Sequence, residues 1–244
     1  MRQVLLLSFF FPFLISCSKY QYISLAGENI QKDQEQQFID EKDSVRIRYN
    51  FNGKNGPVNV TVYNKSTRPV QVDWKRSAVI TGDSSVSLFE PQMKFSGEIE
   101  RNRYSVNQNL SGSLLQAESI DFIPPFSSIS RQTKFIQTKW LKLPEVIAET
   151  KKLKPYHQKI RISSFTQSNS PVVFRVYLTL VSEKADDLRI DNSFYVAEVI
   201  ETKAAPINFV NSGDRFYIKE KTGFGNISTA VFGLGLTVLL IAAL

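Results

Sequence analysis

The sequence predicts a mainly β protein: an immunoglobulin-like antiparallel β-sandwich with one short inserted helix, preceded by a signal peptide and followed by a C-terminal membrane helix. Three observations lead to this fold class. Apolar and polar residues alternate from Val45 onward, a short apolar leader ends at the only cysteine, Cys17, and an uncharged apolar run comes last. With 42% hydrophobic and 22% charged residues, the composition is that of one folded globular domain.

Residues 1–16 have the parts of a secretory signal peptide. Arg2 supplies the positive start, Val4–Ile15 is mostly apolar, and the small residue Ser16 comes last. About a dozen apolar residues are too few to cross roughly 30 Å of hydrocarbon as a helix. We therefore expect a cleaved leader rather than a spanning segment.

The run Leu14-Ile15-Ser16-Cys17 resembles the lipobox of bacterial lipoproteins. In those proteins the leader is cut before the cysteine, which then carries a diacylglycerol and an N-acyl chain. The resemblance implies that Cys17 is lipidated and that membrane lipid is its partner. Three buried acyl chains, at roughly 0.8 kcal/mol per methylene, make such an anchor effectively permanent. The alternative is an ordinary signal peptide that happens to contain a cysteine.

Residues 17–43 are interpreted as the lipidated cysteine and a polar tether. From Ser18 to Asp43 the sequence is polar and Gln-rich, and a segment of this kind can lift a domain off a membrane. Because Cys17 is the only cysteine, the domain has no disulfide. A chain of this length can bury an adequate core without one.

The clearest strand signals lie in the first part of the domain. Val45–Phe51 places four apolar residues on one face and three polar residues on the other, which is typical of a half-buried strand. Alternation returns in Val58–Tyr63 and Val70–Lys75, after the turn residues Asn52–Pro57 and Asn64–Pro69. Short, regular spacing of this kind indicates an antiparallel sandwich or barrel rather than a parallel α/β sheet.

Further strands are predicted along the domain, which we place at residues 44–221. They are Val86–Phe89, Ser119–Ile123, Thr133–Gln137, Ile160–Phe165, Pro171–Val181, Phe194–Ile200 and Asp214–Ile218. Both faces of Pro171–Val181 are apolar, which predicts a central strand covered on both sides. Arg101–Gly112 lacks periodicity and is expected to be a polar loop.

One short helix is predicted as an insertion between strands. Pro144 suits the first helical position, and Glu145 and Glu149 lie where acidic residues favour a helix start. Lys151 lies toward the expected end, and Pro155 would stop the helix.

Residues 222–244 are predicted to form a hydrophobic membrane segment. Ile227–Leu244 carries no charge and, as a helix of 1.5 Å per residue, would span about 27 Å, which is marginal for a bilayer. The nearby glycines lower helix propensity in water but are common in membrane helices. A membrane-inserted helix is therefore favoured over a buried core strand.

Four blocks of the sequence resemble motifs of uncharacterised bacterial cell-envelope lipoproteins. They are Asn64–Ser77, Phe122–Pro125 with the nearby Ser127 and Ser128, Ser170–Arg175 followed by Leu178-Thr179, and Ile190–Val196. The resemblance implies a lipid-anchored β-rich domain. It implies no substrate and no catalytic residue.

The sequence predicts no metal site and no cofactor. His157 is the only histidine and Cys17 is assigned to lipid, so a zinc site or a histidine-based catalytic site is close to excluded. His157 is expected on the surface at a helix end. Asp186, Asp187, Asp191 and Asn192 offer oxygen ligands, but their spacing matches no EF-hand loop. They are expected to form a turn between two strands.

Carboxylates could still serve a hydrolase. Asp73 and Lys75 lie on the polar side of a predicted strand, where a cross-strand charge pair is favoured over an acid/base pair. A glycosidase needs two carboxylates that face each other across a sugar. Glu98 with Glu100 or Asp121 are the candidates.

The expected function is a non-enzymatic one: binding or scaffolding by a membrane-anchored envelope lipoprotein, facing the periplasm, with the outer membrane preferred over the inner. Its partners would be membrane lipid and an envelope protein, without nucleic acid, because the net charge of +7 is spread along the chain. Two alternatives remain open. One is a carboxylate-dependent hydrolase of envelope glycans. The other is a GPI-anchored eukaryotic surface protein, with Asn211-Ser212-Gly213 as the small residues of the anchor signal.

Overall fold

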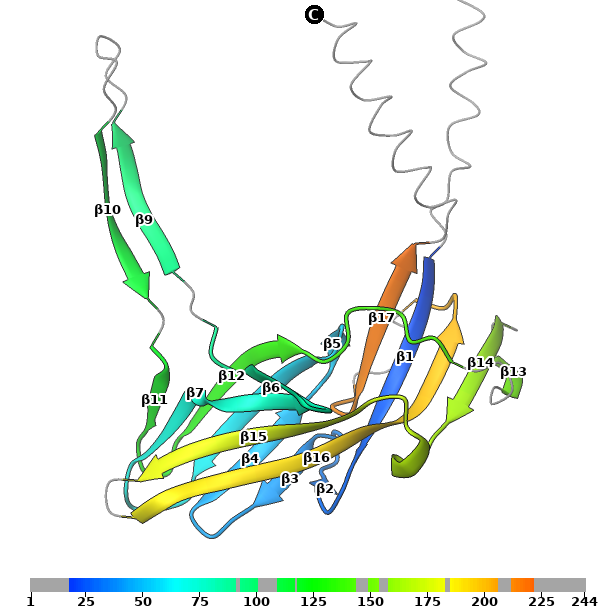
Figure 1. Cartoon of the computed structure of the whole chain (residues 1–244), viewed down its shortest axis with the longest axis horizontal. Helices are drawn as coiled ribbons and strands as arrows, with labels where there is room; N and C mark the ends of the chain where they lie inside the picture. The colour runs from blue at the N-terminus through cyan, green and yellow to red at the C-terminus, as the bar shows by residue number, and fades with distance from the viewer. Residues whose placement is uncertain are drawn as a thin grey trace, which may run out of the picture.

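The structure, a computed structural model, describes residues 18–90, 93–100, 109–116, 118–143, 149–153, 158–182, 185–205 and 212–221. Within these residues the protein is mainly β, as predicted, and its one helical element is the short 3₁₀ turn η3 (Gln167–Asn169). The strands form a large sheet, a smaller sheet and a separate two-stranded hairpin (Figure 1). The expected leader (1–16), Cys17 and the expected membrane segment (222–244) lie outside the described residues.

Ten strands form the larger sheet. They are β1 (Ser18–Gly27), β5 (Gly53–Lys54), β7 (Val70–Thr81), β8 (Ser84–Ser87), β11 (Ile120–Ile123), β13 (Glu149–Leu153), β14 (Gln158–Ser164), β15 (Val173–Ser182), β16 (Ala185–Thr202) and β17 (Arg215–Lys221). The main order is β11-β7-β15-β16-β1-β17-β5, with β8 paired to β7 and the β13–β14 hairpin paired to β16. All pairs are antiparallel except the short β17–β5 contact.

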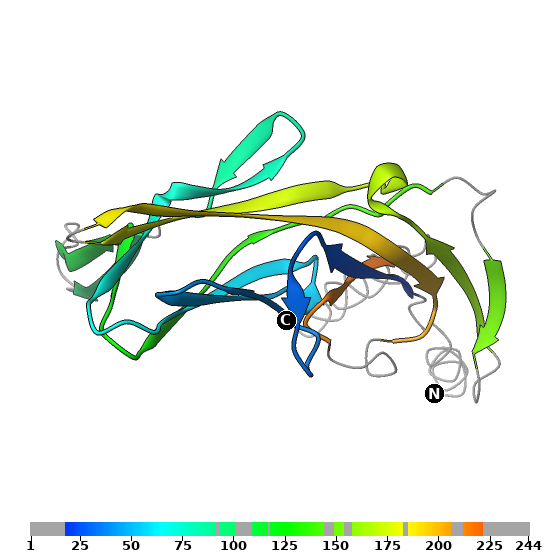
Figure 2. The same cartoon turned by 90° about the horizontal axis from the view of Figure 1, so that it is seen from below.

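Five strands form the smaller sheet, in the order β12-β6-β4-β3-β2. They are β2 (Gln31–Lys32), β3 (Phe38–Glu41), β4 (Val45–Asn50), β6 (Pro57–Asn64) and β12 (Ser128–Phe135). Seen from below, this sheet lies against the long strands β15 and β16 (Figure 2). Val45, Ile47 and Tyr49 of β4 are fully buried while the residues between them are partly exposed, which confirms the predicted alternation.

Aromatic side chains join the two sheets at the centre of one core. Phe194 of β16 packs edge-on against Phe38, Tyr49 and Phe51 of the smaller sheet and its adjoining loop, with ring centroids 5.1–5.3 Å apart. Phe174 of β15 stacks on Phe194 at 5.4 Å. All five rings are at most 1% exposed, and aromatic packing of this kind adds about 0.5–1.5 kcal/mol per pair beyond area burial.

Strand β15 lies between β7 and β16, so the prediction of a central strand is confirmed. The prediction that both its faces are covered is wrong. Val176 and Leu178 on the inner face are fully buried, whereas Val173 on the outer face is 37% exposed and Tyr177 is half-buried. The outer apolar residues suit a β-strand, but no second layer of described residues covers them fully.

Residues 18–43, interpreted from the sequence as a polar tether, are largely strand. Ser18–Gly27 is β1, an internal strand of the larger sheet, and β2 and β3 follow in the smaller sheet. The glutamines of this segment misled the prediction because they lie mainly in the turn between β2 and β3. The tether is therefore absent from residues 18–43, and the folded region begins at Ser18 among the described residues.

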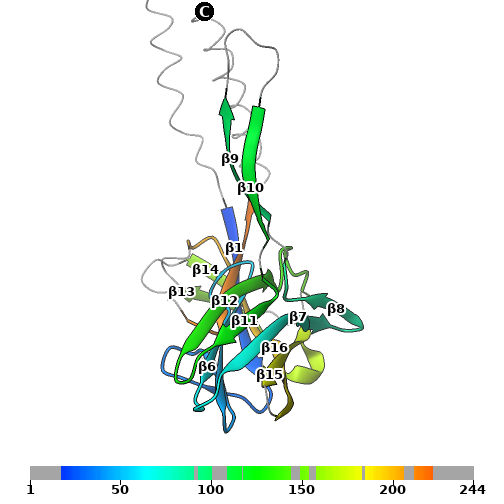
Figure 3. The same cartoon turned by 90° about the vertical axis from the view of Figure 1, so that its left-hand side faces the viewer.

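Two other local predictions were also wrong. Glu149–Leu153, expected as the second half of a helix, is strand β13, because it pairs with Gln158–Ile162 of β14. The first half of that expected helix and His157 lie outside the described residues. Of the expected polar loop Arg101–Gly112, residues 101–108 lie outside the described residues, and the last four residues are strand, at the start of β10 (Asn109–Gln116). β10 pairs with β9 (Met93–Glu100) in a hairpin that extends away from the two packed sheets (Figure 3).

Asn64, the first residue of the resemblance blocks, is a fully buried amide that ties two of those blocks together. Its Nδ2 donates to the carbonyl oxygens of Arg68, Ile123 and Pro124 at 2.6–3.2 Å. Its Oδ1 accepts from the backbone N–H and the hydroxyl of Ser66. These five hydrogen bonds give Asn64 a structural role in the turn.

Asn192, in another block, connects the two sheets. The Tyr49 hydroxyl of β4 donates to Asn192 Oδ1 at 2.7 Å, and Asn192 Nδ2 donates to Asp40 Oδ2 at 3.0 Å. Tyr49 is fully buried, and this burial, with the nearby carboxylates of Asp40 and Asp191, raises the pKa of its phenol well above the usual value.

Replacing Asn64 with Ala is expected to lower the free energy of unfolding by roughly 2–3 kcal/mol, because buried carbonyl groups lose their donor. Asn59→Ala is the matched control: Asn59 is partly exposed and donates one hydrogen bond, to the Asn50 carbonyl at 3.0 Å. Urea denaturation of both variants measures the difference. An Asn64→Ala protein as stable as Asn59→Ala would contradict the role given to this amide.

Stability is expected to fall as the pH rises above about 10. An unfolded tyrosine loses its proton near that pH, whereas buried Tyr49 keeps its proton, so above it the unfolded state binds fewer protons. Each such tyrosine lowers the free energy of unfolding by at most about 1.4 kcal/mol per pH unit. Urea denaturation between pH 8 and 11 should show a shallower decline for Tyr49→Phe, and an unchanged slope would disprove the assignment.

Candidate functional site

The two ends of the described chain meet in one strand pair. β1 and β17 run antiparallel, and Ser18 at the start of β1 lies directly opposite Lys221 at the end of β17. Figure 1 shows these two strand ends side by side, on the side of the molecule toward which the β9–β10 hairpin also extends. Segments before Ser18 and after Lys221 therefore leave the domain from the same point.

Next to these strand ends, the larger sheet extends beyond the smaller one. Figure 2 shows β13, β14 and the end of β16 lying past the edge of the smaller sheet. The inner face of β1 becomes more polar toward Ser18. Leu25 and Ile23 are buried in the core, Gln21 is a buried polar residue, and Lys19 is exposed. The inner face thus becomes polar where the second sheet no longer covers it.

Gln21 is completely buried and fixes a loop over this part of the sheet. Its side-chain amide donates to the carbonyl oxygen of Leu141 and accepts from the N–H of the same residue, both at 2.9 Å. Gln21 Nε2 also donates to Glu201 at 3.1 Å. A buried polar side chain is tolerated here because its donors and acceptor are satisfied.

A pocket of about 830 Å³ lies between this loop and the sheet. Its lining residues come from five separate segments: Lys19, Trp140, Leu141, Lys142, Leu143, Ile160, Arg161, Glu201, Thr202, Lys203 and Glu220. Trp140, Leu141, Leu143 and Ile160 give it an apolar wall. The volume falls in the range of roughly 300–1,000 Å³ that is usual for small-molecule sites.

Basic side chains outnumber acidic ones around the pocket, with four Lys or Arg and two Glu. Arg161 lies 3.5 Å from Glu201, so these two charges offset each other. Lys19 and Glu220 lie directly opposite each other on β1 and β17. Lys142 and Lys203 are exposed and form no ion pair with any residue of the described chain. The pocket therefore combines an apolar wall with uncompensated positive charge.

Tyrosines cover the outer face of the sheet at the same end. The rings of Tyr20, Tyr22 and Tyr217 lie with centroids 6.2 Å apart, and the Lys219 ammonium lies 5.9 Å from the Tyr20 ring. Tyr22 is 2% exposed and donates to the Ala204 carbonyl oxygen at 2.8 Å. Its burial, with the neighbouring Tyr20 and Tyr217, raises the pKa of its phenol.

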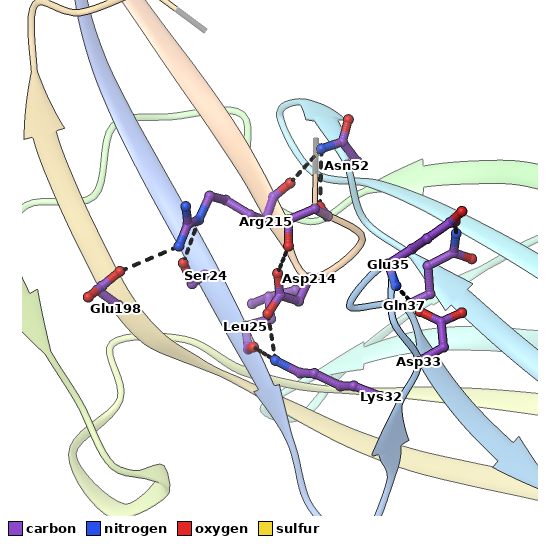
Figure 4. Close-up of polar contacts among 11 residues, drawn as sticks. Ser24, Leu25, Lys32, Asp33, Glu35, Gln37, Asn52, Glu198, Asp214 and Arg215 are labelled. Carbon is purple, nitrogen blue, oxygen red and sulfur yellow. Dashed lines mark hydrogen bonds and ion pairs between the residues drawn. The ribbon is translucent and has the colours of Figure 1, made fainter. Parts of the chain in front are cut away.

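A polar junction fixes the start of β17 to β1 (Figure 4). Lys32 reaches Asp214 at 2.5 Å and also donates to the Leu25 carbonyl oxygen at 3.1 Å. Arg215 donates to the Ser24 hydroxyl at 2.9 Å and lies 3.7 Å from Glu198. These contacts hold β17 in register, which in turn keeps Lys221 opposite Ser18.

Gly213 at this junction passes too close to a neighbouring turn for any side chain. A Cβ on Gly213 would lie 2.9 Å from the backbone N and Cα of Gln37. The Gly213 N–H donates to the Glu35 carbonyl oxygen, and its own carbonyl oxygen accepts from Phe51. A recess of about 540 Å³ beside it is lined by Gln34, Glu35, Gln37, Asn50, Asn52, Ser212 and Gly213. Because Gln37 and Asn52 already bond within the junction, we favour the larger pocket as the candidate site.

The carboxylates considered for hydrolysis do not converge among the described side chains. Asp121 accepts from the indole N–H of Trp74 at 2.6 Å and pairs with Arg131 at 3.0 Å, so it supports packing. Asp73 accepts from the backbone N–H of Arg76, and no ion pair joins it to Lys75. Glu98 and Glu100 lie in β9, whose side chains the structure does not describe.

Of the four residues considered for calcium, the three whose side chains the structure describes are engaged with other groups. Asp187 pairs with Arg76 at 2.6 Å and Asp191 with Arg175 at 2.5 Å, while Asn192 bonds Tyr49 and Asp40 as described above. They lie in strand β16 rather than in the expected turn. In the part of the chain that the structure describes, no cluster of three or more His, Cys, Asp or Glu could hold a metal ion.

Among the residues that the structure describes, no helix is long and apolar enough to span a membrane. The pocket residues were missed from the sequence altogether. One available signal was the alternation of Gln21, Ile23 and Leu25 with Tyr20, Tyr22 and Ser24, which would have identified β1.

The fold and site define a mainly β protein with an open, basic-edged pocket beside its paired terminal strands. The sequence matches no protein-family model, and no curated protein matches it.

Replacing Gln21 with Leu should loosen the Trp140–Leu143 loop, because Leu141 loses both side-chain partners. We expect a loss of about 1–3 kcal/mol in the free energy of unfolding. Acrylamide should also quench tryptophan fluorescence more strongly: Trp74 is fully buried, so the increase reports Trp140. Gln132→Leu, at an exposed position, is the control. Equal quenching in both variants would show that other contacts hold the loop.

Proposed function

We propose that this chain is a membrane-anchored envelope lipoprotein whose β-sandwich domain has a non-enzymatic binding or scaffolding role. The observation that carries the proposal is the pairing of Ser18 with Lys221. Directly opposite residues in antiparallel strands have Cα atoms about 4.5–5.5 Å apart. An acylated Cys17 and an apolar tail after Lys221 would therefore enter the same membrane, at the same end of the domain.

In this proposal the two attachments act together. The acyl chains on Cys17 would supply an effectively permanent anchor, and the tail would add a second one. The domain would stand directly on the membrane without a tether, because β1 begins one residue after Cys17. We place it in the bacterial envelope facing the periplasm, with the outer membrane preferred because an 18-residue apolar run can lie in one leaflet.

The finer fold assignment, an immunoglobulin-like sandwich, is also a proposal. Two facing sheets of antiparallel strands around one core support it. The two facing sheets together hold 15 strands, more than the usual seven to nine of that fold, so the proposal requires added strands, the β13–β14 hairpin among them.

The two alternatives have less support. A carboxylate-dependent hydrolase of envelope glycans would need a pair of free carboxylates, and Asp121 is bonded to Trp74 and Arg131. A GPI anchor attached at Asn211-Ser212-Gly213 would remove β17 from the mature protein. Phe216 and Ile218 of that strand are 1% and 3% exposed, so their loss would open the core.

The proposal predicts that either anchor alone keeps the protein on the membrane. Mature full-length protein should start at Cys17, carry added acyl mass and retain the tail, as measured by intact mass. Membrane fractionation should then show release only when Cys17→Ala and truncation after Thr222 are combined. The single variants serve as controls for each other.

The Cys17→Ala variant needs a different leader, because leader cleavage must still occur. Cys17→Ala also removes the cleavage site, and an uncleaved leader would itself hold the chain, so this variant is made behind an ordinary secretory leader. A mature mass without acyl groups, or a combined variant that stays on the membrane, would refute the dual anchor.

A further inference from the structure

The 830 Å³ pocket lies at the end of the domain where both chain ends leave. Lys19, one of its lining residues, is the second described residue, and Glu220 is the last but one. If the chain is anchored at these ends, the pocket opens close to the membrane surface. Its position therefore brings it within reach of lipid head groups, and this step rests on the proposed function.

The chemistry of the pocket fits an amphiphile with a negative charge. Partly exposed Trp140 and Leu143 present apolar surface from the loop. Leu141 and Ile160 also line the pocket, but they are only 8% and 5% exposed, and Ile160 packs with Tyr22 and Ile200. Contact between this apolar wall and a hydrocarbon chain is favourable, by about 25 cal/mol for each Å² of apolar surface removed from water. Because Leu141 is bonded through its backbone to buried Gln21, this surface is held in place before any ligand arrives.

The charged groups of the pocket select the sign of the head group. The Glu201 carboxylate accepts a hydrogen bond from Gln21 and pairs with Arg161. Its negative charge is therefore offset and repels a bound anion less. Lys142 and Lys203 have no ion-pair partner among the described residues, and both are exposed at the pocket. An ammonium near an anionic membrane surface contributes about 1 kcal/mol of attraction.

We infer that this pocket binds one anionic phospholipid of the membrane, with the phosphate at Lys142 and Lys203 and an acyl chain along Trp140, Leu141 and Leu143. A free phosphate would use only the basic groups and leave the apolar wall exposed. A zwitterionic lipid would use the wall but gain less from the two lysines. Only an acidic lipid would contact the apolar wall with its acyl chain and also bring a net negative charge to the two lysines.

The test uses full-length protein in neutral detergent micelles, titrated with phosphatidylglycerol, phosphatidylcholine or glycerol 3-phosphate. Trp140 fluorescence reports occupancy, because the other tryptophan, Trp74, is fully buried, and native mass spectrometry reports retained lipid. Phosphatidylglycerol alone should change the fluorescence and remain bound. Trp140→Phe should abolish the fluorescence change.

The matched variants test the assigned lysines. Lys142→Gln with Lys203→Gln should weaken phosphatidylglycerol binding by about 25-fold, since each lysine contributes about a factor of five. Lys54→Gln with Lys75→Gln removes the same charge from exposed positions outside the pocket lining and should leave binding unchanged.

Several outcomes would overturn the inference. Equal binding of phosphatidylcholine would remove the selection for charge, and equal binding of glycerol 3-phosphate would make this a phosphate site. A response to neither lipid, as expected if a polypeptide fills the pocket, would also refute it. Acyl mass on Cys17 is measured on the same preparation, so a failure of the anchor proposal is distinguished from a failure of lipid binding.

Discussion

The position of β1 between β16 and β17 is the constraint on which the pocket end of the domain depends. β1 is bonded along both edges, so its loss would expose two unpaired strand edges at once. The same pairing holds Ser18 opposite Lys221 and brings Lys19 and Glu220 to the pocket. The polar junction of Lys32, Asp214 and Arg215 keeps this register from slipping, and a slip of one residue would reverse every side chain of β17.

A difference in extent between the two sheets creates the pocket. Where both sheets are present, aromatic rings fill the space between them, and Phe194 alone contacts four other rings. Where the smaller sheet ends, the loop around Leu141 takes its place and leaves room beside it. Gln21 lies where the inner face of β1 passes from the core to the pocket. An apolar residue there could not bond the backbone of Leu141, and an unpaired polar residue would be costly to bury.

The buried polar groups of the domain serve its architecture. Asn64 closes a turn through three carbonyl oxygens, and Asn192 joins the two sheets through Tyr49. These two amides keep strands and turns in place, because each joins segments that are far apart in the sequence. The pocket lies elsewhere, at the end beside Ser18 and Lys221, where buried or partly exposed apolar side chains lie next to exposed lysines.

The sequence by itself determined the mainly β class and strands such as β4 and β6, because a two-residue alternation is visible locally when one face is buried. Local signals failed where they were ambiguous. The Gln-rich turn between β2 and β3 led to the interpretation of the whole preceding segment, β1 included, as a tether, and charges that suit a helix end also suit strand β13. Only the tertiary structure decided the pocket and the pairing of Ser18 with Lys221. Its lining comes from five segments between Lys19 and Glu220, and their proximity follows from long-range strand pairing that no local pattern encodes.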